Sequence, residues 1–498
     1  LMALLDWLGQ RLGADSTERV SQTARCVEHL LATLNRPQAL ARAVALREQA
    51  AAAMPEWGKA QFENQRLQIE RLLSQGQLQT AYEQARALLE KAQGVGVTAY
   101  RCADYDLAIA HFMLGRVLEK GGQAAPALEL LATAQQLFEA MGQRGERMAA
   151  VALTDQAGCL QALGRLDEAV AKCEEFIRHG EKLESFRNVA AGKGQLATVR
   201  MLQGRYEEAI SGHEAARTLF EQQNEPAMAA TAWHQLGVVY QKAGNYDAAE
   251  AAYRQSLAIS TQRGDLAGQS KTLIELGNLY DAKLNRPEEA MTFYQQAADI
   301  CVELGDLRYE GVARNNNAGT LRRLQRYDEA RGEIQRAIEC YEPFGAAVAI
   351  YKSFAILHKI ETTTGNPAAA RAAWQQARDT YLAYRQQGGY AQFGGGKLVD
   401  HVLGLLTQQQ VDEAQSLFAK LTDNPEVPDS QKQLIQAMVA ILNGSRDPAL
   451  ADDPALDYAD AAEVLFFMGR LAFSLAGDTP CFMSLCETAP LSQRAAEG

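Results

Sequence analysis

Residues 232–260 read AWHQLGVVYQKAGNYDAAEAAYRQSLAIS and determine the fold class of this chain. Apolar residues from Trp233 to Tyr240 recur at helix spacing and therefore share one face. The Gly-Asn step that follows is typical of a turn. Beyond it, small and large residues alternate from Ala249 to Tyr253, which lets two helices approach closely. The stretch therefore predicts an antiparallel helix pair.

A small residue recurs along the chain at an almost constant interval. The clearest copies are spaced 40, 40, 41, 40 and 40 residues apart, at Ala169, Ala209, Ala249, Ala290, Ala330 and Ala370. Weaker copies occur at Ala41, Ala81, Ala127 and Ala414. A period this long predicts a stacked array, in which each unit buries its apolar face against its neighbours.

The motif W-x-x-L-G-x-x-Y, followed by G-x-Y-x-x-A-x-x-x-Y, resembles the tetratricopeptide repeat. The next unit preserves the motif at Leu276, Gly277 and Tyr280, and then at Ala290 and Tyr294. Several further units keep the same phase. The resemblance implies an all-α fold, a right-handed α-solenoid of antiparallel helix pairs.

The repeat is longer than the common tetratricopeptide period of about 34 residues. We expect the second helix of each pair to carry the roughly six additional residues. Long repeats of this kind resemble those of Pins-type polarity adaptors and kinesin light chains. They also resemble arrays associated with bacterial signalling ATPases and caspase-like proteases, and the composition favours a bacterial source.

The phase of the repeat predicts five segments. They are N-terminal helices with a degenerate capping repeat (1–58), the array (59–386), a glycine-rich loop (387–397), irregular repeat-like helices with a C-terminal cap (398–487) and a disordered tail (488–498). The apolar run 461–475 is interpreted as part of this cap, with a docking face for an absent domain as the alternative.

The glycine-rich segment invites comparison with a phosphate-binding loop. The motif G-x-x-x-x-G-K-[S/T] would need glycine at Ala391 and a hydroxyl at Leu398, and no strand pattern precedes it. We therefore interpret the segment as a flexible loop between repeats.

Composition limits the classes of partner. The chain of 498 residues carries a formal net charge of −12, which argues against nucleic acid or an anionic membrane as a partner. No run reaches the roughly 18 apolar residues of a membrane span. The eight cysteines show no C-x-x-C spacing and fall largely at apolar helix positions, which predicts a reducing, cytoplasmic environment.

No catalytic or metal-binding pattern is evident. The seven histidines lack metal-ligand spacing, and Cys481 and Cys486 have no histidine nearby. Cys173 occupies the position that Tyr253 has in its own repeat, so we expect it to be buried and unreactive. A Cys–His pair that meets only in space stays open. We expect no enzymatic activity, no metal and no cofactor.

The inner face of the solenoid is the candidate site, because the first helix of each pair lines the groove in the family that this chain resembles. Alignment on Gly237 assigns a set of mostly polar residues to this groove. They are Thr154, Gln161, Gln195, Thr198, Thr231, His234, Gln235, Gln241, Lys271, Glu275, Asn278, Asp281, Asn315, Asn316, Arg322, Arg323 and Lys359. Amides can donate to and accept from an extended peptide, and basic side chains can hold carboxylates. Asn278 matches the asparagine of the Leu-Gly-Asn motif in Pins-type arrays. Asn317 replaces the usual leucine, and we expect it to be partly buried and hydrogen-bonded.

Two functional hypotheses follow. The first is a protein-interaction scaffold that binds a peptide or a partner's helix in the groove. The alternative is a sensor or regulatory arm of a larger bacterial signalling or defence complex, with the effector domain either absent from this sequence or on a separate subunit. The start at Leu1, which suggests a fragment of a longer protein, and the apolar C-terminal helices favour this alternative.

Overall fold

A computed structural model describes residues 23–24, 26–28, 37–53, 57–74, 77–347, 349–386, 389, 391 and 393–475. Among these residues the secondary structure is helical and no strand occurs, which confirms the all-α prediction. The described chain divides into two compact units, with the boundary between Ala347 and Val348. Most of the predicted N-terminal region before residue 37 and the whole predicted tail 488–498 lie outside the described residues.

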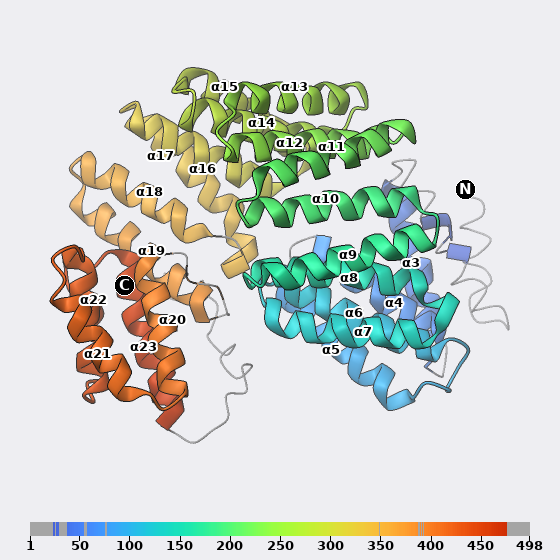
Figure 1. The fold of residues 1–498 in the computed structure, drawn as a ribbon, viewed down its shortest axis with the longest axis horizontal. Coiled ribbons are helices and arrows are strands. Elements are labelled where there is room, and N and C mark those ends of the chain that lie inside the picture. The colour runs from blue at the N-terminus through green and yellow to red at the C-terminus, as the bar shows by residue number, and fades with distance from the viewer. Residues whose placement is uncertain are drawn as a thin grey trace. The chain divides into compact units, whose positions relative to one another are not determined.

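The first unit is a series of helices in which consecutive helices pack against each other, coloured blue to yellow in Figure 1. The helices are α3 (Pro37–Ala52), α4 (Lys59–Ser74), α5 (Leu78–Val95), α6 (Ala103–Lys120), α7 (Ala124–Ala140), α8 (Glu146–Ala162), α9 (Leu166–Lys182), α10 (Phe186–Leu202), α11 (Tyr206–Gln222), α12 (Pro226–Lys242), α13 (Tyr246–Gln262), α14 (Leu266–Ala282), α15 (Pro287–Leu304), α16 (Leu307–Arg323) and α17 (Tyr327–Tyr341). Short 3₁₀ segments cover Gly142–Arg144 and Glu342–Ala347. Because most turns are only a few residues long, neighbouring helices run antiparallel, as a solenoid of helix pairs requires.

The length of the repeat is shared between both helices of a pair. Helices α12 and α13 each contain 17 residues, and three-residue turns separate the helices around them. The expectation that the second helices carry the additional length was therefore wrong. The single 41-residue interval includes a longer turn, the four residues 283–286 between α14 and α15.

The recurring alanine is the fourth residue of the second helix in each pair. This position is occupied in α9, α11, α13, α15 and α17 by Ala169, Ala209, Ala249, Ala290 and Ala330. None of these alanines has exposed surface. A residue this small lets the second helix start close to the first. The period of the sequence thus marks the position at which the second helix of each pair packs closely against the first.

A second close approach lies between a glycine and an aromatic ring. Gly237 on α12 faces Tyr253 on α13, and Gly277 on α14 faces Tyr294 on α15. A Cβ at Gly277 would lie 2.5 Å from Tyr294 Cε1, a distance that real Cβ atoms essentially never show. Tyr253 and Tyr294 are almost completely buried. Glycine is required here because the ring occupies the space of a side chain.

The second unit contains α18 (Ile350–Thr363), α19 (Pro367–Gln386), α20 (Gly394–Thr407), α21 (Val411–Thr422), α22 (Asp429–Leu442), a 3₁₀ segment (Pro448–Asp452) and α23 (Tyr458–Leu475). Helix α23 contacts α19, α20 and α22. Val464 and Phe467 of this helix are completely buried. The apolar run 461–475, for which the sequence also allowed a docking face, therefore buries Val464 and Phe467 against other helices of the same unit.

The glycine-rich segment has a packing explanation. Helix α20 begins at Gly394, and side chains at Gly395 and Gly396 would collide with the carboxylates of Asp460 and Glu463 on α23. Glu463 has no exposed surface and accepts a hydrogen bond from the Tyr381 hydroxyl at 2.9 Å. Its carboxylate also pairs with Arg385 Nε at 2.7 Å. The two glycines therefore allow a helix to start against a buried polar cluster.

Candidate functional site

The first helices of the pairs define the candidate site in the first unit. Helices α4, α6, α8, α10, α12, α14 and α16 each touch the next helix of this series, whereas the second helices of the described pairs make no comparable contact with one another. An array whose first helices lie closer together must curve toward them. We call the surface that these first helices present the inner surface.

A row of acidic and amide side chains runs along the inner surface. The tenth residue of each first helix from α8 to α16 is polar and half-buried: Asp155, Gln195, Gln235, Glu275 and Asn316. The 40-residue period places these side chains at the same position of successive first helices. The interval from Glu275 to Asn316 is 41 residues, and it preserves this register. We call these five residues the polar row.

Neighbouring helices share hydrogen bonds beside the polar row. Gln195 Nε2 donates to the carbonyl oxygen of Thr154 at 2.8 Å. Asn278 Oδ1 accepts from Asn316 Nδ2 at 3.0 Å and from the Tyr294 hydroxyl at 2.9 Å. Asn278 Nδ2 donates to Glu275 Oε2 at 3.3 Å. The oxygen of Asn278 is thus occupied within the protein, and one N–H of its amide remains for a ligand.

Two further predicted groove residues belong to the interior of the helix pairs. His234 Nδ1 shares a hydrogen bond with Thr272 Oγ1 at 3.2 Å, and its ring lies edge-on to Tyr253. Burial lowers the pKa of His234 to about 4, so the imidazole is neutral at pH 7. Gln241 Oε1 accepts from the Tyr253 hydroxyl at 3.0 Å. These side chains fix the helices more than they offer groups to a ligand.

The predicted basic residues differ in their availability. Arg323 pairs with Asp281 on the preceding first helix. Lys271 is exposed and lies 5.0 Å from the ring centre of Tyr309. Arg322 has a buried Nε without a hydrogen-bond partner among the described residues. Lys359 is exposed on α18 and belongs to the second unit, so only the other predicted residues form one helix series.

The remaining predicted residues fall into two groups. The first group has partners within the protein. The hydroxyls of Thr198 and Thr231 donate to carbonyl oxygens of their own helices, each at 3.1 Å, and the side chain of Asn315 is likewise not free. The side chains of Gln161 and Gln235 have no hydrogen-bond partner among the residues that the structure describes. These two amides are consequently free to pair with a ligand.

Burial changes the ionisation of the two acidic members of the polar row. It raises the pKa of Asp155 to about 6, although Arg116 Nε lies 3.6 Å from Asp155 Oδ2 and opposes the shift. Burial also raises the pKa of Glu275, whose carboxylate accepts the hydrogen bond from Asn278. A carboxylate that has lost part of its hydration gains more from a ligand donor than an exposed carboxylate does.

One group with metal-ligand character occurs among the described residues. The ligand atoms of Glu139, Glu175 and His179 lie within 4.8 Å of one another. Gln135 Nε2 donates to both carboxylates, at 2.6 and 3.2 Å, and Lys172 Nζ lies 3.4 Å from Glu175 Oε2. Because these donors already bind the carboxylates, the geometry does not require an ion.

Asn317 departs from its prediction. It is buried, with 6% of its surface exposed, but within the described part of the chain its amide oxygen has no hydrogen-bond partner. The expectation of a hydrogen-bonded amide was therefore wrong for the oxygen. Cys173 follows its prediction, because it is buried and burial raises the pKa of its thiol to about 12.

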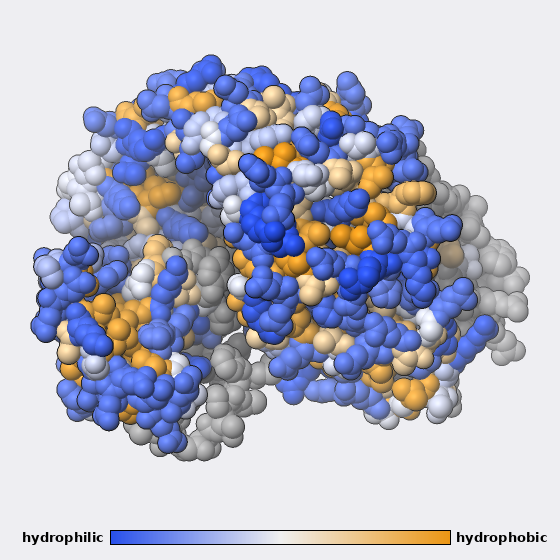
Figure 2. Space-filling view, viewed as in Figure 1, coloured by the Kyte–Doolittle hydropathy of each residue, from blue (hydrophilic) through white to orange (hydrophobic). Residues whose placement is uncertain are grey.

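Figure 2 shows a mainly hydrophilic face of the molecule with scattered apolar patches. None of the helices in the described part of the chain is both long and apolar enough to cross a membrane.

Comparison with known sequences assigns the repeat. The tetratricopeptide repeat family model matches residues 188–262 and 228–301, which cover α10 to α15 almost completely. Residues 188–301 are tetratricopeptide repeats. The pairs on either side of this segment are α8 with α9 and α16 with α17. Each has a three-residue turn between its helices and the same buried alanine, so the packing within these pairs is that of the matched repeats. No curated protein matches the chain.

Several solved structures are similar to the chain. The apo quorum sensor NprR from B. thuringiensis is 16% identical over 74% of this chain and 99% of its own, with a TM-score of 0.45. A signal-transduction ATPase with a tetratricopeptide-repeat sensor from Pyrococcus horikoshii is 13% identical over 75% and 53%, with a TM-score of 0.44. BtubC from P. vanneervenii is 18% identical over 44% and 92%, with a TM-score of 0.41. Because these scores lie below 0.5, none of the three structures bears on the function of this chain.

Proposed function

We propose that this protein is an interaction scaffold that binds an extended peptide or a partner's extended segment along the inner surface of α8 to α16. The polar row is the observation that carries the proposal. Five successive first helices present an acid or amide group at the same helix position. Such a row matches the repetitive backbone of a peptide rather than a compact small molecule.

The chemistry of the polar row favours a ligand with many donors. Asp155 and Glu275 accept hydrogen bonds, and the free amide of Gln235 between Gln195 and Glu275 both donates and accepts. Backbone N–H groups of an extended chain would satisfy these acceptors, and the remaining N–H of Asn278 would meet a backbone carbonyl. Lys271 and Arg322 add positions for an acidic side chain of the ligand.

The proposal is tested with a matched pair of variants. Gln235→Ala removes a member of the polar row whose side chain makes no hydrogen bond to the described residues, and Gln255→Ala removes an exposed glutamine from α13, the second helix of the same pair. A library of random peptides is selected against the unaltered protein, and the affinity of the selected peptides is then measured with both variants. We expect Gln235→Ala to weaken binding by about tenfold and Gln255→Ala to leave it unchanged. Equal affinities for both variants would contradict the proposal.

A further inference from the structure

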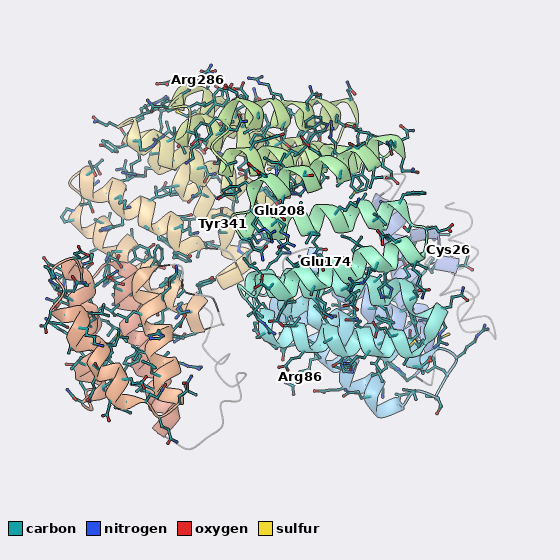
Figure 3. All side chains as sticks on the ribbon, viewed as in Figure 1. Cys26, Arg86, Glu174, Glu208, Arg286 and Tyr341 are labelled. Atoms are coloured by element: carbon teal, nitrogen blue, oxygen red, sulfur yellow. The ribbon has the colours of Figure 1, made fainter. Side chains whose placement is uncertain are left out.

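A pocket of about 400 Å³ opens between the second helices α15 and α17, away from the polar row. Asn317 on α16 lines it together with Glu288 and Gln296 on α15 and with Arg326 and Glu329 at the start of α17. Figure 3 labels Arg286, the residue directly before the start of α15. The volume falls within the range of small-molecule sites.

The buried residue that α16 contributes to the pocket is polar, unlike its counterparts in the two preceding repeats. The equivalent residue of α12 is Leu236 and that of α14 is Leu276, and both are buried apolar side chains. Asn317 is 94% buried, since 6% of its surface is exposed, and its Oδ1 accepts no hydrogen bond from any residue that the structure describes. Burying an acceptor without a partner is unfavourable, so leucine would be favoured if packing alone decided this position.

A polar residue at the same position of α8 shows how the fold satisfies such a group internally. Gln156 is also buried, and its Nε2 donates to Gln135 Oε1 on α7 at 2.8 Å. On α15 the counterpart of Gln135 is Ala298, eight residues after the recurring alanine in both helices. Ala298 has no side-chain hydrogen-bonding group. The amide of Asn317 therefore lacks the internal partner that Gln156 has.

The mouth of the pocket carries an unbalanced negative charge. Arg326 holds Glu329 through two N–H donors, at 2.7 and 2.6 Å, and Arg314 pairs with Glu333 at 3.0 Å. The exposed carboxylate of Glu288 forms no ion pair within 4.0 Å among the described residues, although its charge adds to the Glu329 hydrogen bond in raising the pKa of the Arg326 guanidinium. An acceptor at depth and a carboxylate without a close ion pair at the mouth together suit a ligand that is both cationic and rich in donors.

We propose that this pocket binds a guanidinium or alkylammonium group, with Asn317 Oδ1 as the buried acceptor and Glu288 as the charge at the entrance. The group belongs either to a basic side chain of a partner peptide or to a free polyamine. The pocket opens between the second helices α15 and α17, with Asn317 and Leu321 contributed by α16, and no member of the polar row lines it.

The test measures binding of cationic probes to the full chain by calorimetry. The probes are Nα-acetyl-arginine methylamide, an arginine-containing heptapeptide and spermidine, and the citrulline analogue of the first probe is the neutral control. We expect at least one cationic probe to bind at least about tenfold more tightly than the citrulline analogue. Tighter binding of the heptapeptide would assign the site to a basic side chain, and tighter binding of spermidine would assign it to a polyamine.

Two variants make the test specific. Asn317→Leu restores the residue of the neighbouring repeats, so we expect it to unfold at a higher urea concentration and yet to lose binding by at least about tenfold. Glu288→Gln lies at an exposed position and should weaken binding and reduce its salt dependence without affecting folding. Failure of all three cationic probes to bind, or unchanged binding in both variants, would overturn the proposal.

Discussion

Gly277→Ala tests the packing that sets the distance between the two helices of a repeat. The new methyl carbon would lie 2.5 Å from Tyr294 Cε1 and 2.7 Å from Cδ1. The ring has little freedom to withdraw, because Tyr294 is buried and its hydroxyl is held by Asn278 Oδ1 at 2.9 Å. Overpacking of this kind costs about 1–3 kcal/mol, and displacement of the ring would also lose a hydrogen bond worth about 1 kcal/mol.

Helix propensity acts in the opposite direction, since alanine is favoured over glycine inside a helix by about 1 kcal/mol. We therefore expect Gly277→Ala to destabilise the protein by about 1–3 kcal/mol overall. Gly332→Ala is the matched control, because Gly332 is exposed inside α17 and a Cβ there would meet no atom within 4 Å. This variant should gain up to about 1 kcal/mol from propensity alone.

The measurement is urea unfolding followed by circular dichroism, combined with hydrogen exchange of α14 and α15. Hydrogen exchange is needed because repeat arrays can unfold unit by unit, which a single transition does not resolve. The two variants should shift stability in opposite directions, and the loss in Gly277→Ala should appear in the exchange of α14 and α15. Equal gains in both variants would refute the close glycine–tyrosine packing.

Three further predictions concern buried polar groups. Burial lowers the pKa of His213 to about 4, so the protein should lose stability as the pH falls from about 6.5 to about 4, where only the unfolded chain binds the proton; His213→Leu should show a shallower dependence in urea unfolding at a series of pH values. Burial raises the pKa of Asp460 to about 7, so its contribution to stability should decline as the pH rises from about 4 to about 7; hydrogen exchange of α23 should show that Asp460→Asn removes this decline. Asn278→Ala leaves the buried Tyr294 hydroxyl without its acceptor and should cost about 1–3 kcal/mol in urea unfolding, whereas a loss near zero would mean that the Asn278 network contributes little.

The sequence predicts the features that depend on register. The recurring alanine identifies the fourth residue of the second helix in each pair from α5 to α21, and the Leu-Gly step of α12 and α14 identifies where a first helix meets an aromatic ring. Both are local patterns repeated at one period. The same register places Gln235 and Glu275 on equivalent positions of adjacent first helices. The positions of side chains along each helix were therefore predictable.

Contacts between residues far apart in the sequence were not predictable in this way. The start of α20 at Gly394 depends on carboxylates of α23, more than sixty residues later, which no local pattern connects to the glycines. Whether Asn317 finds a partner depends on the presence of Ala298 on the preceding helix. The pairing of Asn278 with Asn316 similarly needs the packing of α14 against α16. Such features follow from the three-dimensional neighbours of a residue rather than from its period.

Site-specific photo-crosslinking shows directly whether a peptide binds along the inner surface. A photoreactive amino acid replaces either Gln235 on α12 or Gln255 on α13, and each protein is irradiated with a peptide selected against the unaltered chain. We expect a crosslinked product from position 235 and none from position 255. Crosslinking from position 255 alone would place the peptide on the second helices and contradict binding along the inner surface.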